Sequence, residues 1–433
     1  MIQLLHITAH LGGGIGKILS RLVKESKPER DNIRHTIICL DRPEKDQFVE
    51  YVRSYGVQLL VCPSQELLRY QLIKADVVQL EWWHHPVVAN WLCSGELPPM
   101  RLVVWSHVSG LHPPEIPLEF LKIPHRFLFT SPCSWEHPRL AALGPEARQR
   151  VDTVFSSGGF DDLPDPPLRL PNESLRVGYV GTLNFAKLHP RLLDFLAAVD
   201  LPGFRLSLVG DPTTGADLLN QATIRGITEC LDIRGYITNV AAELAQFNVF
   251  AYLLNPLHYG TTENALLEAM AMGVVPIVLD NPAERHLVQH GETGLVVDSP
   301  ATFARALTDL AARPEERFRM AANASREIRE RFSIQRTASA LLSHYQAVLE
   351  EKKWPFDFRS VFGTTPADWF RTCQGVDAWR FPDDEASEKL PLMGVQGPHY
   401  LYEKTKSSVF HYRDVYPDDQ RLQCWAKRLE ATR

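Results

Sequence analysis

The segment of residues 258–297, HYGTTENALLEAMAMGVVPIVLDNPAERHLVQHGETGLVV, carries the residues whose types and spacing point most directly to chemistry. It predicts a short helix that begins near Thr261 and ends at Gly273, followed by a buried strand and a surface turn. Thr261, Asn264 and Glu268 fall on one face of this helix, since seven residues advance about 700°, close to two turns. Glu268 has apolar neighbours, so its carboxylate needs hydrogen-bond partners, which the hydroxyls of a ribose or sugar would supply. The competing interpretation is a solvent-facing glutamate on an amphipathic helix.

The expected start of the same helix offers hydrogen-bond donors to an anion. The backbone amides of Gly260, Thr261 and Thr262 lie there, where free N–H groups and the helix dipole attract negative charge. Glu263 follows them and is a candidate catalytic residue, although the dipole also favours an acidic residue in a first turn without any ligand. Its side chain lies about 140° around the helix from Glu268, so the two carboxylates do not form a general acid/base pair.

A glycine-rich motif, GGGIGK at residues 12–17, follows the first predicted strand. It is not a P-loop, which needs Ser or Thr where Ile18 stands, and the dinucleotide fingerprint G-x-G-x-x-G fails at Lys17. Glycines between a strand and a helix still let backbone N–H groups approach an anion or a sugar hydroxyl closely. Gly13 and Gly14 are therefore candidate ligand contacts, with a tight turn that binds nothing as the alternative.

The rest of the chain predicts the scaffold for these motifs. Apolar strand runs alternate with helical or loop segments through the first third, as in a parallel sheet covered on both faces: IQLLHITA, HTIICL, VQLLVC, DVVQLEW, RLVVWSH and RFLFTS. After a proline-rich linker at residues 163–173 the pattern restarts with LRVGYVGTL and FRLSLVGD. We therefore expect an α/β fold of two doubly wound, Rossmann-like domains facing each other across a cleft, over residues 1–162 and 174–333. Such sheets bind ligands at the carboxyl ends of their strands.

The last hundred residues and one aromatic motif lie outside this scheme. Residues 334–352 predict a helix that closes the second domain, and residues 353–433 form an extension rich in aromatic residues. We expect the extension to be a cover packed on the body of the protein rather than a separate carbohydrate-binding element. The motif WWHH at residues 82–85 follows a strand, and it either stacks on an acceptor ring or takes part in packing.

Composition excludes several classes of protein. The 433 residues, 45% hydrophobic and 23% charged, are typical of a globular chain, and a net charge of −6 gives no general attraction to nucleic acid. The seven cysteines are odd in number and include no C-x-x-C pair, which favours a reducing compartment without a zinc site or disulfides. With no recognisable signal peptide or transmembrane segment, we expect a cytoplasmic protein.

Taken in order, the motifs resemble those of the GT-B nucleotide-sugar glycosyltransferases, specifically the large retaining family 4. The resemblance covers about residues 1–350. It rests on the glycine loop, the histidine of VVWSHVSG, GYVGTLNFAKLHP, SLVGD, DIRGYI, ENALLEAMAMGVVPIV and HGETGLVV. Each motif is weak alone, but their order and spacing in a two-domain chain make a specific pattern.

The resemblance implies roles for single residues. Glu268 matches the glutamate that holds the nucleotide ribose, Lys187 the lysine that contacts the donor diphosphate, and His107 the histidine of the N-terminal domain beside the donor sugar. With Glu263, the last two are the candidate catalytic residues; judged alone, His107 would equally be structural and Lys187 a solvated surface lysine. The other candidates for binding the donor lie in strand-end loops and around the helix start: Gly13, Gly14, Gly181, Thr182, Gly210, Asp211, Ile237, Gly260, Thr261, Thr262 and Asn264.

Two positions depart from the usual pattern of this family. Gly260 stands where the E-x7-E motif has its first glutamate, so the segment resembles the variant N-x-x-L-E. The resemblance then implies that Asn264 and the amides of Thr261 and Thr262 take over the sugar contacts. Thr182 stands where many members have an arginine, so diphosphate binding relies more on Lys187 and on the helix N-terminus.

The implied function is transfer of a sugar from a UDP- or GDP-sugar to a hydroxyl of a glycan, lipid-linked sugar or small natural product, with retention and without a metal or other cofactor. The departing nucleoside diphosphate develops negative charge, so a fixed cation such as Lys187 lowers the barrier. Two alternatives stay open: a nucleotide-sugar epimerase on the same fold, and a non-catalytic sugar-binding module, which the absent first glutamate at Gly260 supports.

Overall fold

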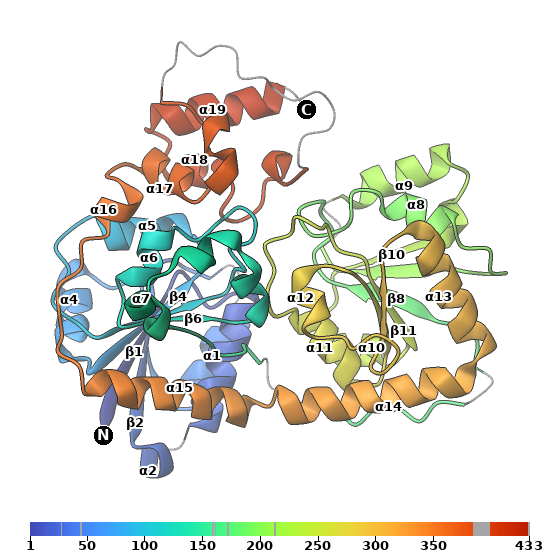
Figure 1. Cartoon of the computed structure of the whole chain (residues 1–433), viewed down its shortest axis with the longest axis horizontal. Coiled ribbons are helices and arrows are strands. Elements are labelled where there is room, and N and C mark those ends of the chain that lie inside the picture. The colour runs from blue at the N-terminus through green and yellow to red at the C-terminus, as the bar shows by residue number, and fades with distance from the viewer. Residues whose placement is uncertain are drawn as a thin grey trace. The chain divides into compact units, whose positions relative to one another are not determined.

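The computed structural model describes the chain except for residues 27, 44–45, 158–159, 161, 171–172, 212–213, 384–398 and 432–433. The chain divides into two compact units (Figure 1). The first unit comprises Met1–Gly158, Tyr259–Thr262 and Ile334–Arg433, and the second comprises Gly159–His258 and Glu263–Ser333. Each unit is built on its own parallel sheet, so the predicted α/β fold of two Rossmann-like domains is confirmed.

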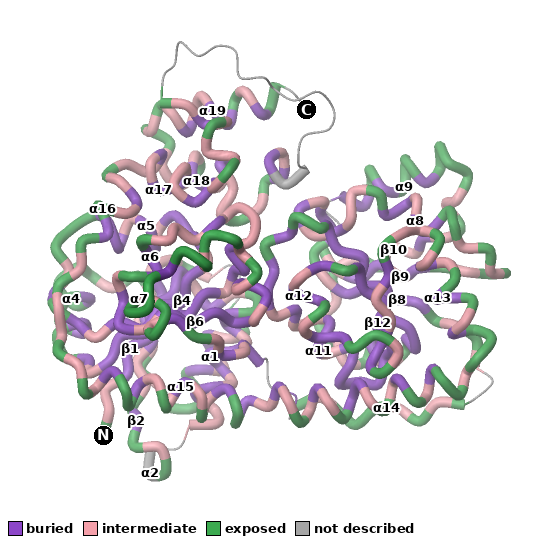
Figure 2. Tube along the Cα trace, viewed as in Figure 1, coloured by how far each residue is buried: buried purple, intermediate pink, exposed green. Residues whose placement is uncertain are grey.

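The sheet of the first unit has seven strands in the order β3-β2-β1-β4-β5-β6-β7, all parallel. They are β1 (Ile2–Thr8), β2 (Ile33–Cys39), β3 (Gln58–Val61), β4 (Val77–Trp82), β5 (Leu102–Ser106), β6 (Arg126–Phe129) and β7 (Val151–Thr153). The first six coincide with the predicted apolar runs. The central strand β4 is buried along its whole length, because neighbouring strands and the helices on both faces cover it (Figure 2).

Helices cover both faces of this sheet. They are α1 (Gly13–Glu25), α2 (Pro28–Asp31), α3 (Gln47–Ser54), α4 (Gln65–Lys74), α5 (Pro86–Cys93), α6 (Leu118–Lys122), α7 (Pro145–Arg150) and α15 (Ile334–Leu349), with 3-10 turns at Pro132–Glu136 and Pro138–Ala142. Ile334, Leu341 and Val348 of α15 are buried in one cluster with Ile18 and Ile37. This helix therefore packs on the first sheet, rather than closing the second domain as we expected, because its apolar stripe fits the face beside α1.

The C-terminal extension is part of the first unit. Its helices are α16 (Arg359–Phe362), α17 (Pro366–Thr372), α18 (Val409–Val415) and α19 (Gln420–Ala431), with 3-10 turns at Gly375–Arg380 and His399–Tyr402. The buried rings of Trp369, Phe370 and Tyr412 share one hydrophobic cluster with residues of β4 and α5. Figure 1 shows α16, α17 and α18 beside α5. The described part of the extension is thus a cover on the first sheet, as predicted.

Three residues of the WWHH motif, Trp82, His84 and His85, are buried and take part in this packing. The Trp82 ring is fully buried, with its centroid 4.8 Å from that of Phe120 and 5.5 Å from that of Phe362. The His84 ring lies 5.1 Å from that of Tyr412, and the His85 ring 4.7 Å from that of His411.

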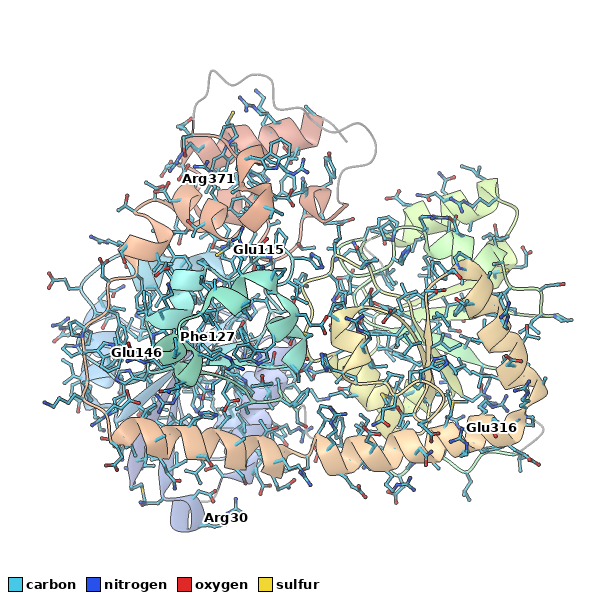
Figure 3. All side chains as sticks on the ribbon, in the orientation of Figure 1. Arg30, Glu115, Phe127, Glu146, Glu316 and Arg371 are labelled. Carbon is cyan, nitrogen blue, oxygen red and sulfur yellow. The ribbon has the colours of Figure 1, made fainter. Side chains whose placement is uncertain are left out.

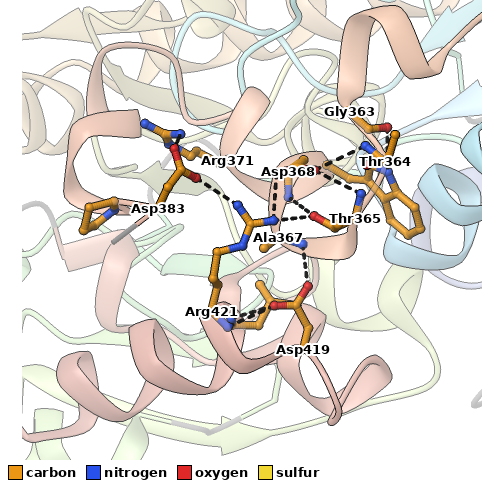
Figure 4. A network of polar contacts seen from close by, with 12 residues as sticks. Gly363, Thr364, Thr365, Ala367, Asp368, Arg371, Asp383, Asp419 and Arg421 are labelled. Atoms are coloured by element: carbon orange, nitrogen blue, oxygen red, sulfur yellow. Dashed lines mark hydrogen bonds and ion pairs between the residues drawn. The ribbon is translucent and has the colours of Figure 1, made fainter. Parts of the chain in front are cut away.

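Polar contacts hold the extension together and tie it to the sheet. The Arg421 guanidinium on α19 donates to Asp368 Oδ1 on α17 and to Asp383 Oδ1, both at 2.8 Å, and also to Thr365 Oγ1 (Figure 4). The carboxylate of Glu115, labelled in Figure 3, accepts a hydrogen bond from the Val376 amide at 3.3 Å. This bond links the loop before α6 to the extension. The Arg421 contacts fix α17 against α19, and the Glu115 contact ties the 3-10 turn at Gly375–Arg380 to the first unit's body.

Buried histidines at this junction make the stability of the first unit sensitive to acid. Burial lowers the pKa of His84 and of His411 to about 4, and it lowers that of His85 as well. Among the charged and titratable neighbours, Lys406 and the ring of His10 disfavour protonation of His85 and His411. Asp41 and Asp414 favour protonation of His411.

We expect the first unit to lose stability as the pH falls from about 6.5 to about 4. In this window the unfolded histidines bind protons and the folded ones do not. The fully buried His84 alone would account for about 3 kcal/mol, since one pKa unit is worth about 1.4 kcal/mol. Urea unfolding followed by tryptophan fluorescence measures this slope, because all nine tryptophans lie in the first unit. His84→Phe should flatten the slope and His290→Asn, at an exposed position, should not; equal slopes in both would contradict the assignment.

The second unit has six parallel strands in the order β10-β9-β8-β11-β12-β13. They are β8 (Val177–Val180), β9 (Leu206–Val209), β10 (Leu231–Gly235), β11 (Val249–Tyr252), β12 (Val275–Leu279) and β13 (Leu295–Val297). The helices are α8 (Leu192–Ala197), α9 (Gly215–Ile224), α10 (Val240–Leu244), α11 (Asn264–Ala271), α12 (Pro282–Arg285), α13 (Pro300–Ala312) and α14 (Pro314–Arg331), with a 3-10 turn at Thr228–Cys230. Among the described helices of both units, none has the length and apolar character needed to cross a membrane.

Candidate functional site

Two glycines bring the strand-end loops of the second sheet close together. Gly181 follows β8 and Gly210 follows β9, the neighbouring strand. A Cβ added to Gly210 would lie 1.8 Å from the carbonyl oxygen of Gly181, so no larger residue fits there. Thr182 and Asp211, the next residues, are both exposed. The predicted donor-binding residues of these loops therefore lie at the carboxyl ends of adjacent strands, where doubly wound sheets bind ligands.

The same edge of the sheet holds a buried ion pair. Lys187, in the loop after β8, places Nζ 2.7 Å from Oε1 and 2.6 Å from Oε2 of Glu263. The hydroxyl of Tyr252, at the end of β11, donates to Glu263 Oε2 at 2.7 Å. Glu263 is 4% exposed and lies at the N-cap position of α11, but its side chain does not cap the helix. Its carboxylate instead binds two neighbouring side chains, and the helix-dipole explanation alone does not account for it.

A second carboxylate lies behind this pair. His258 Nδ1 is 3.8 Å from Glu263 Oε1, and His258 Nε2 is 3.1 Å from Glu284 Oε1. Burial alone would raise the pKa of Glu263, but the Lys187 ammonium and His258 outweigh it and hold this pKa below its usual value. The site therefore keeps an ionised carboxylate and an ammonium side by side with little access to water.

The predicted helix is present as α11, but it begins later than expected. It starts at Asn264, so Gly260, Thr261 and Thr262 precede it and, contrary to the prediction, their amides are not those of the helix start. Thr261 Oγ1 lies 2.9 Å from Thr130 Oγ1, and Thr262 Oγ1 donates to the Thr130 carbonyl at 2.6 Å. These hydroxyl contacts at the end of β6 hold the segment out of helical conformation, and the segment belongs to the first unit.

Asn264 and Glu268 remain on one face of α11. Asn264 Oδ1 is buried and has no hydrogen-bond partner among the described residues, which is unusual for an amide oxygen in a folded protein. Glu268 is half-buried one helical turn further on. A ligand hydroxyl would satisfy the Asn264 oxygen, as the sequence predicts for a sugar. Ile237, predicted to lie near the nucleobase, is half-buried just after β10.

In the first unit, the glycine loop leads directly into α1. The helix begins at Gly13, after Gly12 at the N-cap position, and no side chain caps it. Gly13 has φ of 55°, a left-handed conformation that favours glycine, and both Gly13 and Gly14 are exposed. The helix start therefore presents backbone amides at the carboxyl end of β1, as predicted.

His107 follows β5 and is oriented by a residue that the sequence analysis did not single out. Its Nε2 lies 2.7 Å from Oε2 of Glu81, a fully buried residue of β4, and its backbone amide donates to the Trp82 carbonyl. The imidazole is 10% exposed. His107 is therefore a partly accessible ring fixed from behind by a carboxylate.

Several functional candidates were missed in the sequence analysis. In the second unit these are Tyr252, His258 and Glu284, whose spacing along the chain gives no signal, since three different elements bring them together. In the first unit they are Gln79 and Glu81, for which a signal existed. Two polar side chains at alternate positions of an otherwise apolar strand, VVQLEW, indicate a polar cluster on one face of a buried strand. No group of three or more His, Cys, Asp or Glu residues within the described part of the chain is arranged to hold a metal ion.

Comparisons with known proteins agree with this fold. Residues 174–313 match the model of the family described as glycosyl transferases group 1. HepE of Anabaena, solved in complex with UDP, superposes with a TM-score of 0.63 at 16% identity, over 80% of this chain and 100% of that chain. Sucrose-phosphate synthase of Thermosynechococcus elongatus superposes with a TM-score of 0.61 at 16% identity, over 81% of this chain and 100% of that chain. TarM of S. aureus superposes with a TM-score of 0.61 at 10% identity, over 80% of this chain and 100% of that chain. These structures share the two-domain GT-B fold with the chain. No curated protein sequence gives a significant match.

Proposed function

We propose that this protein, in which residues 174–313 form a group 1 glycosyltransferase domain within a GT-B fold, transfers a sugar from a nucleotide-sugar to a hydroxyl acceptor. The observation that carries the proposal is the buried pair of Lys187 and Glu263 next to the unsatisfied oxygen of Asn264. A fixed cation and adjacent hydroxyl-binding oxygens are what a sugar linked to a diphosphate needs.

The donor we propose is a UDP-sugar. The structures of HepE include complexes with UDP and with UDP-glucose, and their fold matches that of this chain. The ribose would bind Glu268, the base would lie near Ile237, and the diphosphate would lie over the loops of Gly181, Thr182, Gly210 and Asp211. The first unit would contribute Gly13 and Gly14 to the sugar or phosphate, together with the segment of Gly260, Thr261 and Thr262.

Lys187 would stabilise the leaving group. As the bond between the sugar C1 and the β-phosphate oxygen breaks, negative charge grows on that oxygen, and an ammonium held in a buried site stabilises it more than water does. The donor phosphate and Glu263 would both bind the Lys187 ammonium. The Glu263 carboxylate would then also accept a hydrogen bond from a sugar hydroxyl. The acceptor oxygen bonds to C1 on the face that the phosphate leaves, its proton passes to the departing phosphate, and the configuration is retained. We propose that the reaction follows the retaining mode of family 4 and needs no metal. We also propose a cytoplasmic location, because the cysteine pattern favours a reducing compartment.

Thermal-shift measurements against UDP, GDP, ADP, dTDP and their sugars test the donor. A nucleotide at about 100 times its Kd should stabilise the native protein by about 2.7 kcal/mol. We expect UDP and UDP-sugars to raise Tm and the other nucleotides not to. A shift with GDP alone would overturn the assignment of the base.

Donor consumption distinguishes transfer from its alternatives. For a transferase, release of UDP should depend on an added hydroxyl acceptor, such as a glycan or a glycosyl lipid. Conversion of the donor sugar without acceptor would identify an epimerase. Binding of UDP-sugars with no release of UDP, whichever acceptor is added, would favour a non-catalytic module. The glycine at position 260, in place of a glutamate, would then account for the missing activity.

Glu268→Ala should weaken the binding of UDP by a factor of about 10 to 100, because hydrogen bonds to a charged group contribute about 1.5–3 kcal/mol. Isothermal titration calorimetry of UDP against both proteins measures this. Glu330→Ala, at an exposed position of α14, is the matched control and should bind as the wild type does. Equal affinity in Glu268→Ala would remove this residue from the ribose site.

A further inference from the structure

A carboxylate with no exposed surface lies in the middle of the first sheet. Glu81, on the central strand β4, is 0% exposed. Burying an ionised carboxylate is costly unless hydrogen bonds and opposite charge compensate for the lost water. A strand that needed only packing would be served as well by an apolar residue, so the partners of this carboxylate indicate its role.

Three side chains approach the Glu81 carboxylate, one from β4 itself, one from β1 and one from the residue after β5. Gln79 Nε2 donates to Oε1 at 2.6 Å, His6 Nδ1 on β1 lies 3.5 Å from Oε1, and His107 Nε2 after β5 lies 2.7 Å from Oε2. Gln79 in turn accepts the hydroxyl of Tyr345 on α15. Oxygen Oε1 thus has two buried partners, Gln79 and His6. Oxygen Oε2 contacts His107, whose side chain is partly exposed.

The geometry determines which nitrogen of His107 carries the hydrogen. Burial by itself would raise the pKa of Glu81, but the hydrogen bonds from His107 and His6 outweigh it and keep the carboxyl ionised. An ionised carboxylate only accepts hydrogen bonds. The hydrogen between the two groups therefore belongs to Nε2 of His107, and in the neutral ring Nδ1 is left with a lone pair.

We propose that Glu81 is a positioning residue for His107: it holds the imidazole in the Nε2–H tautomer and turns Nδ1 outward as an acceptor for a hydroxyl of the bound sugar. The sugar contact rests on the proposed function, whereas the tautomer does not. Gln79 and His6 complete the arrangement by fixing Glu81, as partners behind an oriented imidazole commonly do.

The tautomer can be measured without any substrate. In the native protein labelled with 15N-histidine, long-range 1H–15N spectra distinguish protonated from unprotonated ring nitrogens, and His107→Gln assigns the signals. We expect Nε2 of His107 to be protonated and Nδ1 not, at a pH where the ring is neutral. A ring protonated on Nδ1 would overturn the proposal. Because this readout needs no donor, it remains decisive even if glycosyl transfer is never found.

Kinetics test the consequence once a donor is known. Glu81→Gln should lower kcat/KM by a factor of about 10 to 100, the range found when a partner that orients a metal-bound imidazole is removed. In a His107→Ala background the same change should cause almost no further loss, because Glu81 acts through His107. Glu81→Asp, which keeps the charge, should retain more activity than Glu81→Gln and offers a second variant if the amide does not fold.

A matched control separates positioning from loss of stability. Val78→Ala removes a buried side chain of the same strand. Successive side chains of a strand alternate between its faces, so Val78 lies on the face opposite Glu81. The change should lower Tm while leaving kcat/KM within about twofold. If Glu81→Gln and His107→Ala have independent, additive effects, Glu81 does not act through His107 and the proposal fails. If UDP-sugars prove not to be substrates while the tautomer is as expected, the proposed function fails and the positioning role stands.

Discussion

Lys187→Met is expected to lower donor turnover by a factor of about 10² or more, the effect of removing one fixed charge-stabilising donor from a reacting site. Methionine keeps the length of the side chain and removes its charge. The leaving diphosphate would then lose the ammonium that now lies 2.6–2.7 Å from the Glu263 oxygens. Release of UDP in the presence of acceptor is the measurement. Turnover equal to that of the wild type would remove Lys187 from the mechanism.

The same substitution should also affect stability. It leaves the Glu263 carboxylate buried without its cation, which for broken buried pairs costs about 3–5 kcal/mol. Because the folded pKa of Glu263 is lowered, the pair stabilises the protein above the carboxyl's ordinary pKa and this contribution is lost as the pH falls through the folded pKa. The destabilisation of Lys187→Met, measured by circular dichroism in urea, should therefore be smaller at low pH than at pH 7.

A double variant separates the two effects. Lys187→Met with Glu263→Gln removes both charges, so we expect it to recover much of the lost stability but none of the lost turnover. Lys122→Met, a partly exposed lysine on α6, is the control for removing a positive charge and should change neither property. If the double variant recovered activity along with stability, the effect of Lys187 would be structural.

Phe370→Ala is expected to destabilise the first unit by about 3–5 kcal/mol, the usual cost of truncating a buried phenylalanine. The Phe370 ring is 2% exposed, with centroids 4.9 Å from Phe381 and 5.4 Å from Tyr412. Its neighbours belong to the cluster shared by the extension and α5. We therefore expect the extension and the first sheet of the variant to unfold together, in one transition at a lower urea concentration than in the wild type.

Tryptophan fluorescence is a selective probe for this experiment, since all nine tryptophans lie in the first unit. Trp379→Ala, in the same extension but 51% exposed, should change the stability by no more than about 0.5 kcal/mol. A separate early transition in Phe370→Ala, with the main transition unmoved, would show instead that the extension is an independent module.

Regular elements were predictable because their signals are local. The apolar runs of β1 to β6 and the glycine turn before α1 follow from residues that are neighbours in the chain. Several partners of Glu263 and Glu81 do not follow from such local signals, because Lys187, His6 and His107 lie tens of positions away from them in the chain. Lys187 and Glu263 are 76 positions apart, for example. Spacing along one element cannot reveal such a pairing, although the polar residues of β4 marked where to look.

Two errors have the same physical origin. Helical periodicity predicts that α11 starts near Thr261. In the structure the hydroxyls of Thr261 and Thr262 bind Thr130, and this tertiary contact outweighs the local helix propensity. The helix α15 was assigned to the second domain because it follows it in sequence. Its apolar stripe shows that it must pack on something, but only the three-dimensional structure identifies the first sheet as its partner.

The composition of the first unit has a consequence for biosynthesis. Its sheet is encoded at the beginning of the chain, whereas α15 and the extension that complete its core come from Ile334–Arg433. At a translation rate of about 5–20 residues per second, the second unit is complete before the ribosome has made the helices that cover β4 and α5. The unit whose sheet emerges first is therefore completed last, and its apolar face stays uncovered until residues 334–433 have been synthesised.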